Sequence, residues 1–151
     1  MLTITPNIHP FIVHFTIALL TVGTLAMLLG LRLKAEPVAT QIRALAHWSL
    51  WIGGVFALLA GISGLFAYNS VRHDSVSHLA MQDHRAWALA TIVVFVIAAL
   101  LSLRAIRNGL RPSPAVAVLC VLGLGLLMST GWRGGELVYR HGLGVMSLPT
   151  P

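Results

Sequence analysis

The sequence predicts an all-α membrane protein whose four transmembrane helices form an up-down-up-down antiparallel bundle. Of its 151 residues, 57% are hydrophobic and only 9% are charged, and the mean hydropathy is +0.86. A soluble domain carries about 25% charged residues, so ten Lys and Arg with four Asp and Glu cannot coat a surface that faces water. A water-soluble fold is therefore excluded, and lipid must solvate most of the surface.

Four apolar segments are long enough to cross about 30 Å of hydrocarbon, which takes roughly 20 residues of helix. The fourth starts near Pro112 or Pro114, where proline suits the first turn of a helix. Residues 133–151 form a glycine-rich tail that is expected at the membrane interface, and the chain is expected to be one domain. The predicted helices cover about residues 8–31, 44–68, 84–103 and 113–132.

Short connections make successive helices antiparallel neighbours, and the longest connection is expected between the second and third helices. The first basic residue is Arg32, so the first segment lacks the positive start of a cleavable signal peptide and is expected to be retained. The connections after the first and third helices hold six Lys and Arg, against four at the opposite face. The positive-inside rule then predicts a bacterial inner membrane protein with both termini in the periplasm. These loop charges account for the net charge of +6, and no nucleic-acid partner is expected.

Histidines are concentrated near the predicted outer face, and only His47 lies toward the inner one. Ionisable residues are costly inside a membrane and are therefore functional candidates. His73 and His78 are interpreted as solvated residues of the long connection. The outer histidines are His9, His14, His73, His78, His84 and His141.

A pair of these histidines predicts a haem site. His14, in the first helix, and His84, at the start of the third, are expected at similar depths on diagonal helices. Two imidazoles that face each other across a bundle core can hold a haem iron from both sides, each with an acceptor on its other ring nitrogen. Arg85 and Arg133 lie at the same face and are candidates to pair with the propionates. His9 and His141 are the substitute ligands if one assignment fails.

The first hypothesis is thus a small b-type membrane cytochrome, an electron carrier with one bis-histidine haem b near the outer face. An iron held by two histidines has no open coordination position, so electron transfer is expected rather than oxygen chemistry. No nucleophile stands in a recognisable activating motif, which favours an electron-transfer or binding protein over a stand-alone enzyme. A redox protein or a quinone is the expected partner.

Two other functions use the same features. Copper or zinc can bind imidazoles such as His14, His84, His9 and His141, although the sequence has neither CxxC nor HExxH spacing. The third hypothesis is an accessory subunit of a larger respiratory or photosynthetic complex, or a homo-oligomer. The small residues Gly53, Ala57 and Gly61 either leave room for a macrocycle or allow close helix packing, and the spacing favours packing.

Two motifs resemble those of a known family. Residues 8–20 (IHPFIVHFTIALL) are similar to the opening HPxxVHFPIALL signature of the bacterial membrane family called domain of unknown function 2231. Residues 129–145 (STGWRGGELVYRHGLGV) resemble its closing SGWLGGELVYRHGVGV signature, and His84 with Arg85 matches its histidine in the third helix. The sequence departs from the pattern at Thr16, where the family commonly has proline, and His47 matches no family position.

The resemblance covers nearly the whole chain and implies four helices. It also implies that the motif residues lie at one membrane face. Relatives fused to c-type cytochrome modules imply an electron-transfer setting by association, and the resemblance supplies no activity of its own. The motif residues are His9, His14, His84, Glu136, Tyr139 and His141.

Overall fold

The computed structural model describes residues 8–71 and 73–145, and these residues form four long α-helices. Each long helix is apolar enough to span a membrane. The predicted fold class is confirmed: the structure is all-helical, and its neighbouring helices pack as antiparallel pairs. The elements are α1 (His9–Arg32), α2 (Val38–Ser70), α3 (Ser75–Ser102), the short 3-10 helix η1 (Leu103–Asn108) and α4 (Pro114–Tyr139).

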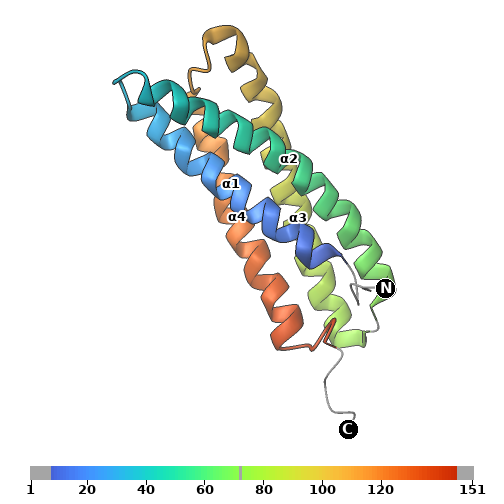
Figure 1. Cartoon of the computed structure of the whole chain (residues 1–151). Helices are drawn as coiled ribbons and strands as arrows, with labels where there is room; N and C mark the ends of the chain where they lie inside the picture. The colour runs from blue at the N-terminus through green and yellow to red at the C-terminus, as the bar shows by residue number, and fades with distance from the viewer. Residues whose placement is uncertain (1–7, 72, 146–151) are drawn as a thin grey trace, which may run out of the picture.

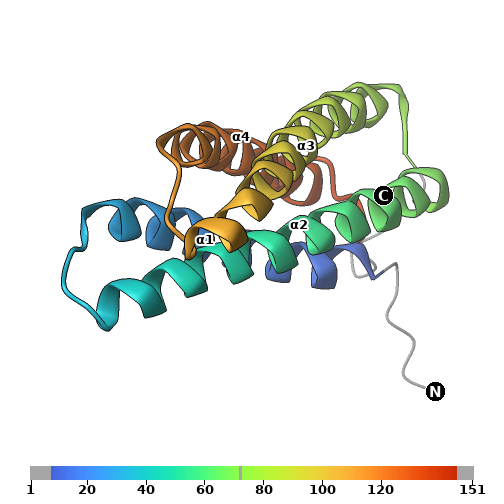
Figure 2. The same ribbon diagram turned by 90° about the horizontal axis from the view of Figure 1, so that it is seen from above.

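The bundle consists of two helix pairs (Figures 1 and 2). Helix α1 packs most extensively on α2, and α3 on α4, whereas α2 with α3 and α1 with α4 make smaller contacts. Figure 2 shows the two pairs as two layers. We call the boundary between the layers the seam. Helices α1 and α3 are therefore diagonal partners, as expected from the short connections.

Small residues bring the helices close together. A Cβ atom added to Gly53 would lie 2.7 Å from Cδ2 of Leu20 in α1, and one added to Gly61 would lie 2.9 Å from Cδ1 of Ile92 in α3. Close helix packing is thus confirmed for these positions, and apolar side chains rather than open space lie beside them. The large buried side chains of the core come from all four helices: Leu20, Met27, Leu50, Phe95, Cys120 and Leu127.

The outer surface of the bundle is apolar. Between 22% and 33% of the most apolar window of each helix is buried inside the protein, so most of its hydrophobic side chains point outward. Exposing such an apolar surface to water costs free energy, whereas exposing it to the hydrocarbon of a membrane does not. The surface therefore fits a protein that is surrounded by lipid.

The predicted helix boundaries are wrong at three places. Helix α2 starts at Val38 rather than at residue 44, α3 starts at Ser75 rather than at His84, and α4 continues to Tyr139. Residues 133–139 of the expected tail are thus helical, and residues 146–151 lie outside the described part of the chain. Hydropathy predicts the part of a helix that lies in hydrocarbon, not the end of the helix. The 33 residues of α2 are about 50 Å long, so this helix extends beyond the hydrocarbon layer.

A capping box explains the early start of α3. The carboxylate of Asp74 accepts hydrogen bonds from the backbone N–H of Ser77, at 2.8 Å, and from its hydroxyl. The backbone N–H of Asp74 donates to the Ser77 hydroxyl at 3.0 Å. These bonds satisfy donors at the helix start. The expected long connection between the second and third helices is consequently a short turn.

His47 fastens the connection between α3 and α4 at the opposite end of the bundle. Its ring is 1% exposed, and Nε2 lies 3.2 Å from the carbonyl oxygen of Leu110. A carbonyl can only accept, so Nε2 carries the hydrogen and Nδ1 does not. Within the described residues, Nδ1 has no hydrogen-bond partner. Leu110 adopts a left-handed backbone conformation with φ of 59°, and the bond to His47 helps to hold it there.

Candidate functional site

Six of the seven histidines lie in the half of the bundle where α1 begins, α2 turns into α3, and α4 ends. We call this the histidine end. Figure 1 shows these three segments at the same end of the bundle. Their gathering follows from the antiparallel topology, which returns the chain to this end after every second helix. The expected concentration of histidines at one end of the bundle is confirmed by the helix order.

The side chain of His84 extends from α3 to the backbone of the neighbouring helix α4. Its Nδ1 lies 3.2 Å from the backbone carbonyl oxygen of Thr130 and must donate to it. In the neutral ring this leaves the lone pair on Nε2. A Cβ atom added to Gly134 would lie 3.3 Å from Cε1 of His84, so the glycine provides the space that the imidazole occupies. His84 is therefore oriented by α4.

His9 is held in a similar way by α2. Its Nδ1 lies 3.1 Å from the Ser63 hydroxyl oxygen, and this hydroxyl in turn donates to the carbonyl oxygen of Ala60 at 3.1 Å. The hydroxyl oxygen thus accepts a hydrogen bond from Nδ1–H of His9. A Cβ atom added to Gly64 would lie 3.1 Å from Cε1 of the ring.

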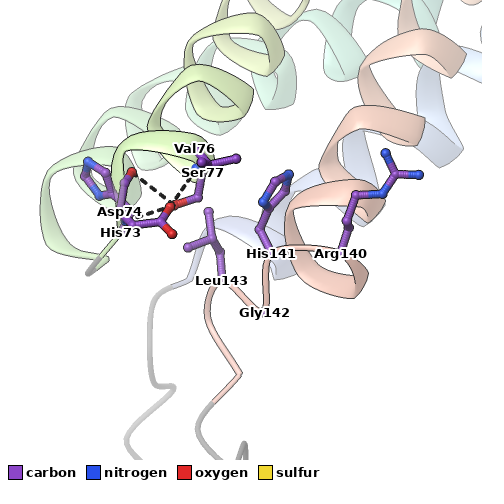
Figure 3. Close-up of a pocket in the computed structure, with 8 residues that line it drawn as sticks. All are labelled: His73, Asp74, Val76, Ser77, Arg140, His141, Gly142 and Leu143. Carbon is purple, nitrogen blue, oxygen red and sulfur yellow. Dashed lines mark hydrogen bonds between the residues drawn. The ribbon is translucent and has the colours of Figure 1, made fainter. Parts of the chain in front are cut away.

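His14 and His141 occupy other positions at the histidine end. The His14 ring is exposed on α1, and its Nδ1 donates to the carbonyl oxygen of Pro10 at 2.5 Å. His14 is therefore exposed rather than turned toward His84 across the core, whereas His9 is partly buried against α2. His141 follows the end of α4 and lines an open groove with His73 and Asp74 (Figure 3). Whether His14 or His141 binds a cofactor stays a prediction.

Both arginines that were expected near haem propionates already have partners. The Arg133 guanidinium lies 4.2 Å above the ring of Trp87 and pairs with the Asp83 carboxylate. The Arg85 guanidinium lies 5.5 Å from the centre of the Tyr68 ring. The Arg133 ion pair is partly exposed, so it can exchange its partner at modest cost.

A polar contact that the sequence analysis did not identify lies beneath His84. The hydroxyl oxygens of Thr91 and Thr130 are 2.9 Å apart across α3 and α4, and each hydroxyl also bonds a carbonyl one turn earlier in its own helix at 2.8 Å. Ser63, Gly64 and Gly134 were also missed. Glycine within a helix is a signal of close approach by another group, but the sequence does not say which group approaches.

Two carboxylates outside the spanning segments have lowered pKa values. The hydroxyl and backbone N–H of Ser77 lower the pKa of Asp74, because both donate hydrogen bonds to the charged form. The hydroxyl of Thr40 similarly lowers the pKa of Glu36 at the opposite end, with a further contribution from Arg43. Both carboxylates therefore serve to fix turns between helices.

Metal ligation by a larger cluster is not supported in the described part of the chain. Residues 8–71 and 73–145 contain no group of three or more His, Cys, Asp or Glu side chains placed to hold a metal ion. Zinc commonly uses three or four protein ligands. Of the described histidines, His73 and His78 lie within hydrogen-bonding distance of each other.

Comparison with known proteins gives one result. The family model described as "Predicted membrane protein (DUF2231)" matches residues 5–147, and the chain therefore belongs to the family called domain of unknown function 2231. No curated protein and no solved structure gave a match.

Proposed function

Since the chain is a member of this membrane-protein family, we propose that it is a small b-type membrane cytochrome. It carries electrons through one bis-histidine haem b at the histidine end of the bundle. The observation that supports this proposal is that the His9 and His84 rings, which come from diagonal helices, are each oriented by a hydrogen bond through Nδ1. A redox protein or a quinone would exchange electrons with it there.

His84 has the features of an axial ligand. A haem ligand must be a neutral imidazole whose other nitrogen donates to an acceptor, because that bond fixes the tautomer and raises the basicity. The bond from Nδ1–H to the carbonyl oxygen of Thr130 meets this requirement and directs the lone pair to Nε2. Gly134 permits this orientation because it has no side chain.

His9 is the second ligand in this proposal. Its Nδ1–H donates to the Ser63 hydroxyl, so in the neutral ring the lone pair is on Nε2. His14 has the same tautomer, because its Nδ1 donates to the carbonyl oxygen of Pro10. Its ring is exposed, however, so it could bind only a haem at the surface of the bundle. A haem between His9 and His84 requires the two layers to separate, and the seam is where the helix contacts are less extensive.

The coordination decides the type of chemistry. When bound, a haem with two imidazole ligands supplies one-electron transfer and leaves no position open for oxygen. Arg133 can supply a positive charge to a propionate by exchanging its partly exposed carboxylate partner, Asp83. The bonds to Ser63 and to Thr130 orient the two imidazoles.

Absorption spectra of the purified protein test this function. Protein expressed with ample haem should show a Soret band and, after dithionite, the sharp α-band of a six-coordinate haem. His84→Ala and His9→Ala should lose both bands. His73→Ala, a change to an exposed histidine at the same end, should keep them and is the matched control. Wild-type protein without a Soret band excludes the cytochrome, and a band lost with His14→Ala but kept with His9→Ala would identify His14 as the ligand.

The same purification distinguishes the accessory-subunit hypothesis. A stable partner that co-purifies with the chain, while no cofactor is present, would select that function in place of the cytochrome. A second copy of this chain in the same preparation would indicate a homo-oligomer.

We also propose an orientation in which the histidine end faces the periplasm of a bacterial inner membrane. The opposite end carries more Lys and Arg, which the positive-inside rule places in the cytoplasm. In a background with Cys120→Ser, a membrane-impermeant maleimide should label Ser75→Cys in intact spheroplasts but not Lys34→Cys. The reverse labelling pattern would invert the topology.

A further inference from the structure

The turn between α2 and α3 holds a second histidine pair that the proposed haem site does not use. Nε2 of His73 and Nδ1 of His78 are 3.0 Å apart. The ring centres are 5.0 Å apart and the ring planes differ by 14°. Because the nitrogens are so much closer than the ring centres, they lie on the edges that face each other. The two rings therefore direct one nitrogen each toward a common point.

Each ring is anchored through its other nitrogen. Nδ1 of His73 donates to the carbonyl oxygen of Val71 at 2.8 Å. Nε2 of His78 lies 3.0 Å from the side-chain amide of Gln82 and 3.4 Å from the hydroxyl of Tyr68. A metal-binding histidine donates a hydrogen bond from its outer nitrogen. His73 already does so, whereas Nε2 of His78 accepts from the Gln82 amide nitrogen.

An ion can replace the hydrogen between the two rings without any net change in protonation. The carbonyl of Val71 fixes the hydrogen of His73 on Nδ1, so its Nε2 already carries a lone pair. His78 needs only to move its hydrogen from Nδ1 to Nε2. The Tyr68 oxygen and, after rotation of its amide, the Gln82 oxygen can accept that hydrogen. Both rings then present a lone pair to the common point.

We propose that His73 and His78 form a binding site for monovalent copper. Imidazole suits copper, zinc and nickel, but zinc commonly takes four ligands, and the described residues supply no third His, Cys, Asp or Glu to this pair. Monovalent copper has a filled d shell and accepts two nitrogens in line. A single positive charge is also easier to place than a double one near Arg85, whose guanidinium lies over the Tyr68 ring.

The turn has the freedom and access that such a site requires. Metal–nitrogen bonds of about 2.0 Å on each side would need the nitrogens to be about 4 Å apart, or about 1 Å farther than observed. His73 is exposed and precedes the first residue of α3, so it can withdraw by this distance without disturbing a helix. The exposure of His73 also lets an ion reach this side of the pair from solvent, and His73 is one of the residues that line an open groove of about 650 Å³ (Figure 3).

Competition with a coloured copper(I) chelator tests the site. Detergent-purified protein under anaerobic, reducing conditions should withdraw one copper(I) ion per chain from bicinchoninate. His73→Ala and His78→Ala should each weaken binding by at least roughly tenfold, since removal of even an outer partner of a metal ligand costs ten- to 100-fold. His14→Ala removes another exposed histidine from the same end and should bind as the wild type does. No withdrawal of copper, or equal losses in all three variants, would overturn the proposal.

X-ray absorption at the copper edge gives a test that needs no variant. The wild-type protein should show a two-coordinate copper(I) ion with two imidazole nitrogens, and a spectrum with three or four ligands would refute the assignment. The result is separable from the haem proposal. His9→Ala and His84→Ala should keep copper binding, whereas His73→Ala and His78→Ala should keep any Soret band.

Discussion

Gly123 offers a direct test of the packing between α3 and α4. A Cβ atom added there would lie 2.9 Å from both Cε2 and Cζ of Phe95, a ring that is completely buried. Overpacking of this kind costs about 1–3 kcal/mol, while replacing glycine by alanine within a helix gains about 1 kcal/mol of helix propensity. Gly123→Ala should therefore be neutral or destabilising by up to about 2 kcal/mol.

Gly125→Ala is the matched control because it isolates the steric cost. A Cβ atom at Gly125 meets nothing within 4 Å, and both glycines lie in the interior of α4. The propensity gain cancels between the two variants, so Gly123→Ala should be less stable than Gly125→Ala by about 1–3 kcal/mol. Reversible unfolding by SDS in mixed micelles, followed by circular dichroism, measures the difference. Equal stabilities within about 0.5 kcal/mol would refute the packing argument.

A double variant tests whether the steric cost of Gly123→Ala arises at the ring of Phe95. Phe95→Leu removes the atoms that the new methyl group would meet, so it should recover part of the loss when it is combined with Gly123→Ala. Because the two residues are in contact, their effects should not add. If the changes in unfolding free energy of the two single variants simply add in the double variant, the methyl group added at Gly123 does not act through Phe95.

Three other outcomes follow from single contacts. The pKa of Asp74 is lowered in the folded protein, so the cap of α3 contributes stability above the unfolded pKa and loses this contribution as pH falls through the folded pKa. Ser77→Ala should raise the folded pKa of Asp74. NMR titration of the Asp74 carboxyl group should then show protonation beginning at a higher pH than in the wild type. Cys120 is fully buried, so N-ethylmaleimide should modify it only after SDS unfolding; rapid modification of the folded protein would contradict its burial. His47→Phe removes the bond to the carbonyl of Leu110 and should cost about 1–3 kcal/mol, with faster tryptic cleavage in the connection before α4; unchanged cleavage would show that the bond does not hold this connection.

The number and order of the helices could be predicted from hydropathy because lipid imposes a strict condition. A segment that crosses hydrocarbon must satisfy its backbone internally and be apolar over its whole length. Helix ends carry no such condition outside the hydrocarbon. The Asp74–Ser77 cap therefore extends α3 through a polar stretch that hydropathy assigns to a loop.

His14 and His84 were predicted as a pair because they were expected at similar depths on diagonal helices, and neither criterion determines which way a side chain faces. His9 and His14 are five residues apart, which turns the helix by about 140°. Only one of them can face the interior, and the structure shows that it is His9, whereas His14 is exposed. The helical period alone could have shown that His9 and His14 do not both face the interior. Only the packing of α1 on α2 decides which of the two rings turns inward.

The deciding signal lies in the partner helices rather than in the histidines. His9 rests on Gly64 of α2 and His84 on Gly134 of α4, and in both cases a Cβ atom would approach Cε1 of the ring to between 3.1 and 3.3 Å. A methyl group at either glycine would crowd its imidazole, so both rings depend on the absence of a side chain in the partner helix. Sequence alone cannot pair each glycine with its histidine, because the residues of each pair are about 50 positions apart in the chain. The geometry of the site is thus a property of helix packing, and it becomes visible only once α1 is placed on α2 and α3 on α4.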